Sequence, residues 1–409
     1  MEVYLDYAAT SPVKSAVFKI LEPYLKENFG NPSSIYRKGQ ISRKSIDEAR
    51  VKIANFLNCD PQEIIFTSGG TEADNLAING IIENFDKPHI ITSMIEHHAV
   101  LNTCKYLEKT GQAEVTYLKP SRDGVIDVED IKKAICENTI LVSVMYVNNE
   151  IGTVQPIREI GKMIEKENKQ RLENSVKRKI DNTKTLNSAN YQPIYFHTDA
   201  VQASEYQEMN VQYLHVDLLS LSGHKIGAPK GIGALYVKKS IPFSAMMHGG
   251  EQEMGKRAGT ENVAGIVALG KAVELIKKTK TKTKKLRDYF IDRVLKEIPA
   301  VHLNGSYEFR NPNNANFYFK YIEGESILLN LDLVGIAASS GSACASASLN
   351  PSHVLMAAYG DAERAHGSIR FTLGENTTKK EIDYTINKLK IIVEKLRKIS
   401  PLTPLELRS

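Results

Sequence analysis

The sequence predicts an α/β protein, with a large domain on a mostly parallel sheet and a smaller α+β domain. Two observations predict this fold class. Up to about residue 265, short runs rich in Val, Ile and Leu alternate with helical segments, which is typical of βαβ units. Beyond that point the pattern changes to helices with only short strands between them, ending in KEIDYTINKLKIIVEKLRKI, so we expect a second domain there.

The expected strands are short apolar runs, each followed by polar residues. Helical stretches such as TEADNLAINGIIENF, HHAVLNTCKYLEKTG and REIGKMIEKENK separate the first of them. Ligands of such sheets bind at the carboxyl ends of the strands, so the polar residues that close each strand are the first candidates for a site. The expected strands cover residues 63–68, 89–96, 139–147, 194–200, 216–223 and 232–237.

Composition argues against several classes of protein. The 409 residues carry 53 basic and 48 acidic side chains, and the resulting net charge of +5 does not indicate a nucleic-acid partner. No apolar run reaches the roughly 20 residues needed to span a bilayer. The N-terminus MEVYLDYAATSPV resembles neither a signal peptide nor a transit peptide. We therefore expect a cytoplasmic protein that contacts no membrane.

Two segments differ from the rest in composition. Residues 166–192 are rich in Lys and Asn, which predicts a solvated insertion between a helix and the next strand. The basic run KKTKTKTKKLRDYF, residues 277–290, has two interpretations: the solvated face of a long helix or a site for an anionic partner. We favour the first, because a charge run alone separates the two poorly.

The cysteines stand at positions 59, 104, 136 and 344 and form no C-x-x-C pair. A fixed metal site or a redox dithiol is therefore not expected. Cys104 and Cys136 lie in helix-like stretches and are interpreted as small, half-buried thiols. Cys344 lies instead in ASSGSACASASL, a run of small residues typical of a loop, which favours a reactive role for its thiol.

Two strand ends carry residues whose side chains could bind an aldehyde cofactor. Lys225 follows the strand-like run 216–223 and is either a surface lysine at a turn or an amine for a Schiff base. Asp199 closes the run 194–200 and either caps the next segment or pairs with a pyridinium nitrogen.

Two further strand ends add a phosphate cradle and a ring. In TSGGTEADN, Gly70 and Thr71 open a helix whose first amides favour a phosphate, although Thr71 with Asp74 also fits an ordinary capping arrangement. His97 in IEHHAV is either a cap histidine or an imidazole that stacks on a cofactor and relays protons. Each feature is weak alone, but together they supply a cradle, a stacking ring, a carboxylate and an amine.

These residues carry a resemblance to a known family. The chain resembles cysteine desulfurases of the NifS/IscS type, fold-type-I pyridoxal phosphate enzymes of the class V aminotransferase branch. The similarity covers nearly the whole chain except residues 166–192. The matching stretches are VYLDYAATSPV, FGNPSS, IIFTSGGTEADNLAI, EHHAVL, VSVMYVNNEIGTVQPI, HTDAVQ, SLSGHKIGAPKGIGALYV, RAGTENV, SSGSACASASLNPSHVLMA and GSIRFTLG.

The resemblance implies a fold-type-I architecture with a seven-stranded, mostly parallel sheet. It assigns residues 14–265 to a large cofactor-binding domain and residues 1–13 and 266–409 to a small domain that carries the loop 338–349. It also implies a homodimer, in which Thr260 of one subunit serves the site of the other.

The resemblance further implies roles for the residues that match the family motifs. Lys225 would hold pyridoxal 5'-phosphate covalently, Asp199 would pair with its ring nitrogen and Gln202 would bond its ring oxygen. His97 would stack on the ring and shuttle protons. The implied phosphate ligands are Gly70, Thr71, Ser222, His224 and Thr260.

For the substrate, L-cysteine, the resemblance implies that Asn149 and Arg370 hold the amino acid, with Arg370 on its carboxylate. Cys344 would take the sulfur as a persulfide, release alanine and pass the sulfur to an iron–sulfur scaffold protein or another acceptor. A transferred cluster would contact Cys344 only transiently.

Other functions remain open at this stage. An aminotransferase or a selenocysteine lyase shares the fold, and a non-enzymatic sulfur carrier would keep the fold without catalysis. A transaminase needs no Cys344, and a carrier needs no intact Lys225, Asp199 and His97.

Overall fold

The computed structural model describes residues 1–181, 191–276, 280–340 and 350–408. Within this part of the chain, seven strands form a central sheet in the order β2-β8-β7-β6-β5-β3-β4. All neighbours pair in parallel except β8, which is antiparallel to both β2 and β7. The strands are β2 Ile64–Thr67, β3 His89–Ser93, β4 Glu114–Leu118, β5 Thr139–Ser143, β6 Tyr195–Asp199, β7 Leu218–Ser222 and β8 Gly233–Val237. The predicted mostly parallel sheet is therefore confirmed.

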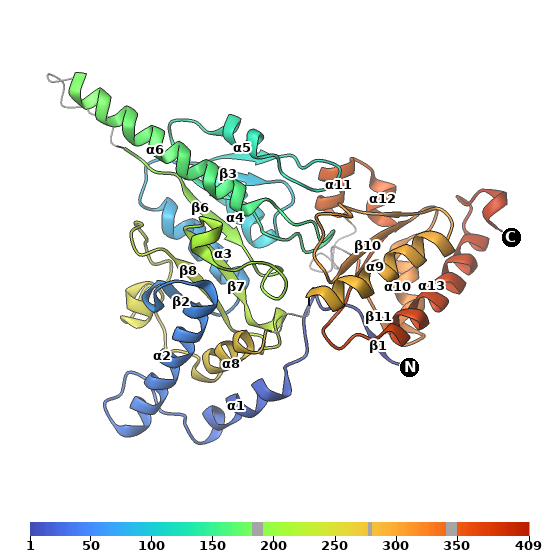
Figure 1. The fold of residues 1–409 in the computed structure, drawn as a ribbon, viewed down its shortest axis with the longest axis horizontal. Helices are drawn as coiled ribbons and strands as arrows, with labels where there is room; N and C mark the ends of the chain where they lie inside the picture. Colours follow the sequence, from blue (N-terminus) through green and yellow to red (C-terminus); the bar gives the residue numbers. More distant parts are fainter. Residues whose placement is uncertain (182–190, 277–279, 341–349, 409) are drawn as a thin grey trace.

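Helices cover both faces of this sheet (Figure 1). Alternate strand residues point to opposite faces: Ile65, Leu141 and Leu235 pack with α3 and α4, whereas their neighbours Ile64 and Val142 pack with α2, α6 and α8. Because both faces are buried, these strands are continuous apolar runs rather than alternating ones. The helices are α1 Ser15–Lys26, α2 Arg37–Leu57, α3 Gly70–Ile82, α4 His98–Lys109, α5 Val128–Ala134, α6 Ile157–Asp181, α7 Val211–Leu214 and α8 Val263–Glu274.

A second body holds the three-stranded antiparallel sheet β12-β10-β9 and its own core. The ring of Phe290 meets those of Phe317 and Phe371 edge to face in this core, with centroid distances of 5.5 and 5.2 Å. Its elements are α9 Lys280–Glu297, β9 Val301–Leu303, β10 Asn314–Phe319, α10 Gly324–Asp332, β11 Ile336–Ala337, α11 His353–Tyr359, α12 Ala362–His366, β12 Ser368–Thr372 and α13 Lys379–Ile399.

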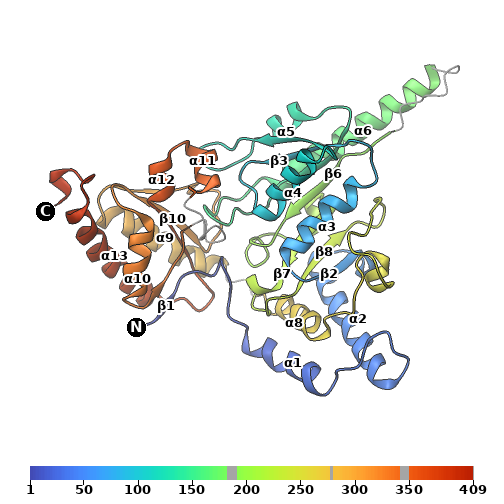
Figure 2. The same ribbon diagram turned by 180° about the vertical axis from the view of Figure 1, so that it is seen from behind.

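The N-terminus belongs to this second body. Strand β1, Val3–Tyr4, pairs in parallel with β11, and Val3 and Leu5 lie in the second core. The chain then crosses to α1 beside the large sheet (Figure 2). Helix α8 packs in the first core through Ile266 and Leu269, so we move the proposed domain boundary from residue 266 to about residue 275.

The first part of the predicted insertion is helical. Helix α6 runs to Asp181 and extends away from the sheet (Figure 1). The guanidinium of Arg171 donates to the carbonyls of Cys136 at 2.6 Å, Thr139 at 3.0 Å and Gln192 at 3.2 Å. Residues 166–181 thus continue α6 instead of forming a connection after it, and most of residues 166–176 are exposed, in keeping with a solvated segment. Residues 182–190 lie outside the described residues.

No helix in the described part of the chain combines the length and apolar character needed to cross a membrane.

Candidate active site

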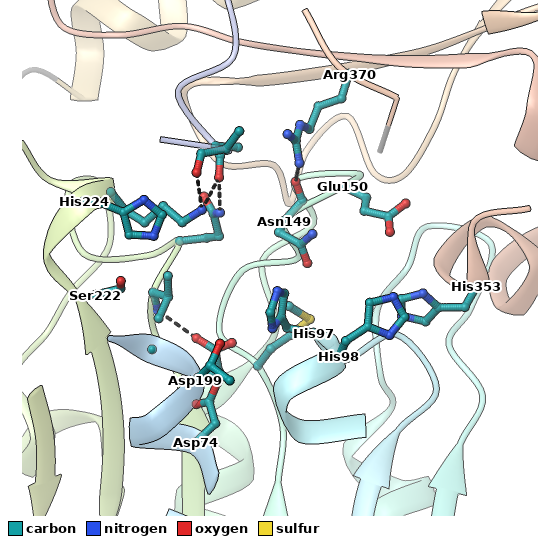
Figure 3. A pocket seen from close by; sticks show the side chains of 18 residues that line it. Asp74, His97, His98, Asn149, Glu150, Asp199, Ser222, His224, His353 and Arg370 are labelled. Carbon is teal, nitrogen blue, oxygen red and sulfur yellow. Dashed lines mark hydrogen bonds between the residues drawn. The ribbon is translucent and has the colours of Figure 1, made fainter. Parts of the chain in front are cut away.

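A cavity of about 390 Å³ lies at the carboxyl edge of the large sheet, where residues from several strand ends meet (Figure 3). The second body closes it through Arg370 of β12 and His353 of α11, and the N-terminal segment adds Ala8 and Ala9. The sequence-predicted residues that line this cavity are Gly70, Thr71, His97, Asn149, Asp199, Gln202, Ser222, His224, Lys225 and Arg370. The fold thus brings together side chains that stand far apart in the sequence.

The start of α3 fits an anion. Its N-cap residue, Gly69, makes no side-chain capping bond, so the first amides of this 13-residue helix are available to a ligand. A Cβ on Gly70 would lie 2.8 Å from a methyl of Val201, which explains the glycine at this close approach. Asp74 does not cap the helix as one interpretation had it, because its buried carboxylate lies 3.7 Å from Nε2 of His197.

Asp199 presents a buried carboxyl group to the cavity. Only 6% of the residue is exposed, and one carboxylate oxygen accepts the Val201 amide at 2.9 Å. Burial raises its pKa to about 6, against the opposing effect of the Lys225 charge. The pKa of Asp74 is raised well above its ordinary range by burial and by Asp199. A cationic ring nitrogen beside Asp199 would offset the cost of burying its negative charge.

Lys225 lies directly after β7 and points at the N-terminal segment. Its Nζ donates to the carbonyls of Ala8 at 2.6 Å and Ala9 at 2.8 Å. Gln202 donates to the same Ala8 carbonyl at 2.9 Å. Sequence reasoning assigned no role to Ala8 and Ala9, although both stand in the matching stretch VYLDYAATSPV. The pairing of β1 with the second body brings them here.

His97 caps α4 and faces the cavity. Its Nδ1 accepts the Ala99 amide at 3.1 Å, so the proton of the neutral ring is assigned to Nε2. Burial, followed by the charge of Lys225, lowers the pKa of His97 to about 4. Burial and Lys225 also lower the pKa of His224 to about 4. Both rings are therefore neutral at neutral pH.

Arg370 offers an unsatisfied guanidinium edge. It is 3% exposed, and it donates from Nη1 to the Asn149 carbonyl and from Nη2 to a carboxylate oxygen of Asp6, both at 2.8 Å. Its buried Nε has no hydrogen-bond partner among the described residues. A guanidinium with a spare N–H edge is suited to a carboxylate. Asp6 is a site residue that sequence reasoning missed.

Three more missed residues line the opposite wall. His98 and His353 face each other with ring centroids 4.6 Å apart, and Glu150 lies beside them (Figure 3). The second histidine of EHHAV was visible in the sequence, but no local pattern connects it with His353 about 250 residues later.

The cavity does not include every predicted residue. Thr260 lines a separate cavity of about 160 Å³ with Ser68 and Arg257. Cys344 lies outside the described residues, although both flanks of its segment are fixed. Ser339 exchanges two backbone bonds with Arg370, at 2.7 and 3.2 Å, and the Ser352 hydroxyl donates to Glu150 at 2.5 Å.

The remaining cysteines lie away from this cavity. Cys104 is buried in α4, and burial raises its pKa and that of Cys59 to about 12. The prediction for Cys136 is wrong, since it is exposed and follows the end of α5. The described residues contain no group of three or more His, Cys, Asp or Glu side chains that could hold a metal ion.

Comparison with known proteins gives the family. The profile described as Aminotransferase class-V matches residues 3–172 and 175–385. Cysteine desulfurase IscS of Dictyoglomus turgidum is 52% identical, over 98% of this chain and 96% of the relative. Cysteine desulfurase IscS of Methanosarcina thermophila is 50% identical, over 100% of this chain and 96% of the relative.

Solved structures agree with the sequence relatives. A NifS-like protein superposes with a TM-score of 0.85 at 33% identity and covers 97% of this chain and 100% of its own. The structure titled SspA in complex with cysteine gives a TM-score of 0.77 at 34% identity, over 92% of this chain and 100% of its own. The chain belongs to the class V aminotransferase family and, within it, to the cysteine desulfurases.

Proposed function

We propose that this protein removes sulfur from L-cysteine, releases L-alanine and holds the sulfur as a persulfide on Cys344 for iron–sulfur cluster assembly. The observation that carries the proposal is the set of groups in one cavity: an amine at Lys225, a buried carboxyl at Asp199 and a spare guanidinium edge at Arg370. The names of the relatives, and a relative's complex with cysteine, support the same substrate.

The cavity fits pyridoxal 5'-phosphate. Asp199 is a buried carboxyl group that a cationic ring nitrogen would satisfy, and the open N-terminus of α3 suits a phosphate. In this proposal Gly70, Thr71, Ser222 and His224 hold the phosphate, and Lys225 anchors the cofactor covalently. The bound cofactor would supply an electron sink for the carbon atoms of the substrate.

The protein's own residues place the substrate. Arg370, which lines the cavity, would receive the carboxylate, and Asn149, whose carbonyl already orients Arg370, would complete the contact. Gln202 would bond the ring oxygen of the cofactor, and His97 would stack on its ring and shuttle protons.

Sulfur transfer is the step assigned to Cys344. Its thiolate would attack the substrate sulfur, so that a sulfur–sulfur bond forms while the carbon–sulfur bond breaks and its electron pair stays on the carbon side. That carbon takes a proton to become the methyl group of alanine. Cys344 is five residues beyond Ser339, which is bonded to Arg370.

We also propose that the enzyme is a homodimer. Large apolar side chains on α1 and on the connection to α2 are exposed, among them Phe29 at 65% and Ile35 at 90%. Exposed apolar side chains of this kind mark association surfaces. Thr260 lies outside the main cavity, as expected if it serves the site of a second subunit. Ile35→Asp should then lower the mass measured by light scattering to that of a monomer.

A single-turnover experiment tests the function. Purified holoenzyme is mixed with L-cysteine, and alanine and the mass of the Cys344 peptide are followed together. One alanine per subunit with one added sulfur on that peptide is the expected result. Alanine without the added mass would indicate a lyase, and neither product would leave the aminotransferase or carrier interpretations.

A further inference from the structure

The end of the cavity that suits a phosphate has a carboxylate beside it to which no role has been given. Glu72 stands in the first turn of α3, directly after Gly70 and Thr71, which line the cavity. A Cβ on Gly70 would lie 3.5 Å from the Cβ of Ser222. The start of α3 therefore lies beside Ser222, which Figure 3 shows on the wall of the cavity. An anion bound there would share the first turn of α3 with the charge of Glu72.

Glu72 is ionised at neutral pH. Its side chain is 11% exposed, and burial alone would raise its pKa. The hydrogen bonds from Arg257 and from the Ser68 amide outweigh burial, so the pKa of Glu72 lies below its ordinary value. A carboxylate in the first turn stabilises a helix, but it also repels a second anion at the same helix end. Without a cation beside it, Glu72 would therefore weaken phosphate binding.

Arg257 supplies this cation. Its Nε donates to Oε1 of Glu72 at 2.8 Å, and its Nη2 donates to Oε2 at 3.3 Å. The Ser68 amide donates to the same Oε2 at 2.7 Å, which fixes the turn that leads into α3. Both carboxylate oxygens of Glu72 are thus directed at partners outside the helix. A guanidinium that bonds both oxygens neutralises a carboxylate and also sets its direction.

Two further ion pairs hold the segment that carries Arg257. Residues 253–261 are tied to α2 and α3 by three arginine–glutamate pairs. These pairs are Arg50–Glu253, Arg43–Glu261 and Arg257–Glu72, with N–O distances of 2.8, 2.7 and 2.8 Å. Glu253 is the other acid that raises the pKa of Arg257, after Glu72 itself, and Arg50 already neutralises it. Glu72 is therefore the carboxylate left for Arg257.

We propose that Arg257 is a positioning residue for the cofactor phosphate: it neutralises Glu72 and turns this carboxylate away from the anion site at the start of α3. The inference rests on the proposed function, because it takes pyridoxal 5'-phosphate as the cofactor. Arg257 lines the smaller cavity beside Thr260 and acts on the phosphate through Glu72.

A purely mechanical role for the same ion pair would be to fasten residues 253–261 to α3. The two roles predict different results when both partners are replaced. A fastening contact is lost to the same extent whichever partner is removed. An unpaired carboxylate, in contrast, disappears when Glu72 is replaced together with Arg257.

The affinity of the full-length protein for pyridoxal 5'-phosphate, measured after removal of the cofactor by dialysis, separates the two roles. At pH 8, Arg257→Met leaves Glu72 ionised and unpaired. An extra negative charge within about 10 Å of a bound anion costs on the order of tenfold in affinity at an effective dielectric constant of about 20. The Kd of Arg257→Met should therefore rise by about this factor.

Three further variants complete the test. Glu72→Gln and the double variant Glu72→Gln with Arg257→Met should stay within about threefold of the wild-type Kd, because loss of the ion pair itself costs little. Arg257→Lys should keep most of the affinity, because it keeps the charge although it loses the planar fork.

Pyridoxal, which lacks the phosphate, is the control ligand, and its Kd should be the same in the wild type and all four variants. Arg293→Met is the matched control variant, because Arg293 forms an ion pair with Glu297 on α9 of the second body. It should change neither Kd. Equal losses in Glu72→Gln, Arg257→Met and the double variant, or an equal loss for pyridoxal, would overturn the proposal.

Inorganic phosphate gives a second readout that needs no covalent bond to the protein. As a competitor of pyridoxal 5'-phosphate, it should bind Arg257→Met more weakly than the wild type and the double variant, and equal binding would reject the proposal. Neither test contains L-cysteine. If the protein formed no alanine from L-cysteine, the proposed function would fail, whereas the order of these affinities would still decide the role of Arg257.

Discussion

Asp6 and Arg370 form an ion pair that joins the N-terminal segment to the substrate cavity, with Nη2 of Arg370 donating to a carboxylate oxygen of Asp6 at 2.8 Å. The side chain of Arg370 is 3% exposed and that of Asp6 is 17% exposed. Two bonds, one to Asp6 and one to the Asn149 carbonyl, use one N–H on each terminal nitrogen, and the buried Nε has no partner among the described residues. Asp6 thus helps to hold the guanidinium in one orientation in the cavity.

We expect Asp6→Ala to weaken substrate binding more than turnover. Removing one partner of a buried ion pair leaves an uncompensated charge, which costs about 3–5 kcal/mol in unfolding free energy. The KM for L-cysteine should rise about tenfold with a smaller change in kcat, because the freed guanidinium no longer holds one orientation. Urea unfolding and steady-state kinetics measure the two effects. Asp6→Glu should recover part of the KM, and an unchanged KM in Asp6→Ala would contradict the positioning role.

Cys344→Ser should abolish persulfide and alanine formation while leaving substrate binding intact. A hydroxyl at neutral pH is not ionised and cannot replace the thiolate as the nucleophile. The change in the visible spectrum on adding L-cysteine should therefore persist. Cys136→Ser is the matched control, because Cys136 is exposed and does not line the cavity. Full alanine formation by Cys344→Ser would place the nucleophile elsewhere.

Glu96 should make folding stability fall as the pH rises. It is fully buried, and burial raises its pKa from 4.5 to about 8. Between these two values the unfolded chain releases the proton while the folded protein keeps it, so the folded state loses relative stability with increasing pH. The loss should be on the order of 3 kcal/mol between pH 4.5 and pH 7.

The comparison that checks this uses Glu96→Gln. This variant removes the titration, so its free energy of unfolding should decline less steeply from pH 5 to pH 8 than that of the wild type. Glu394→Gln, at an exposed position of α13, should show the wild-type slope. Identical slopes in Glu96→Gln and the wild type would show that Glu96 titrates normally.

Arg171→Ala should loosen α6 without affecting catalysis. The side chain donates to three carbonyls in the neighbouring loops, and carbonyls left without their donor cost about 1–3 kcal/mol. Amide hydrogen exchange in residues 165–181 should become faster, whereas the initial rate with L-cysteine should stay the same. Lys169→Ala, at an exposed position on the same helix, is the control. Unchanged exchange in Arg171→Ala would mean that α6 is held by other contacts.

Much of the fold could be predicted from local patterns. The runs that become β5, β6 and β7 are rich in apolar residues and buried at every position, because both faces of the sheet are covered, and this apolar content can be read from the sequence. The strand-end residues Asp199 and Lys225 could be selected for the same reason. The helix at residues 166–181 could not be predicted in this way. Arg171 in this helix bonds carbonyls in loops more than 30 residues away in sequence.

The sequence by itself determined the fold class, the family and the side chains that the chemistry requires, since strand periodicity and short motifs are local properties. Only the tertiary structure decided which groups meet. Asp6 reaches Arg370 because β1 pairs with β11, and His353 reaches His98 because α11 packs on Ile95 and Ile151. These contacts join residues hundreds of positions apart. They follow from apolar burial, within the second core for Asp6 and between the two bodies for His353, which leaves no local pattern in the chain.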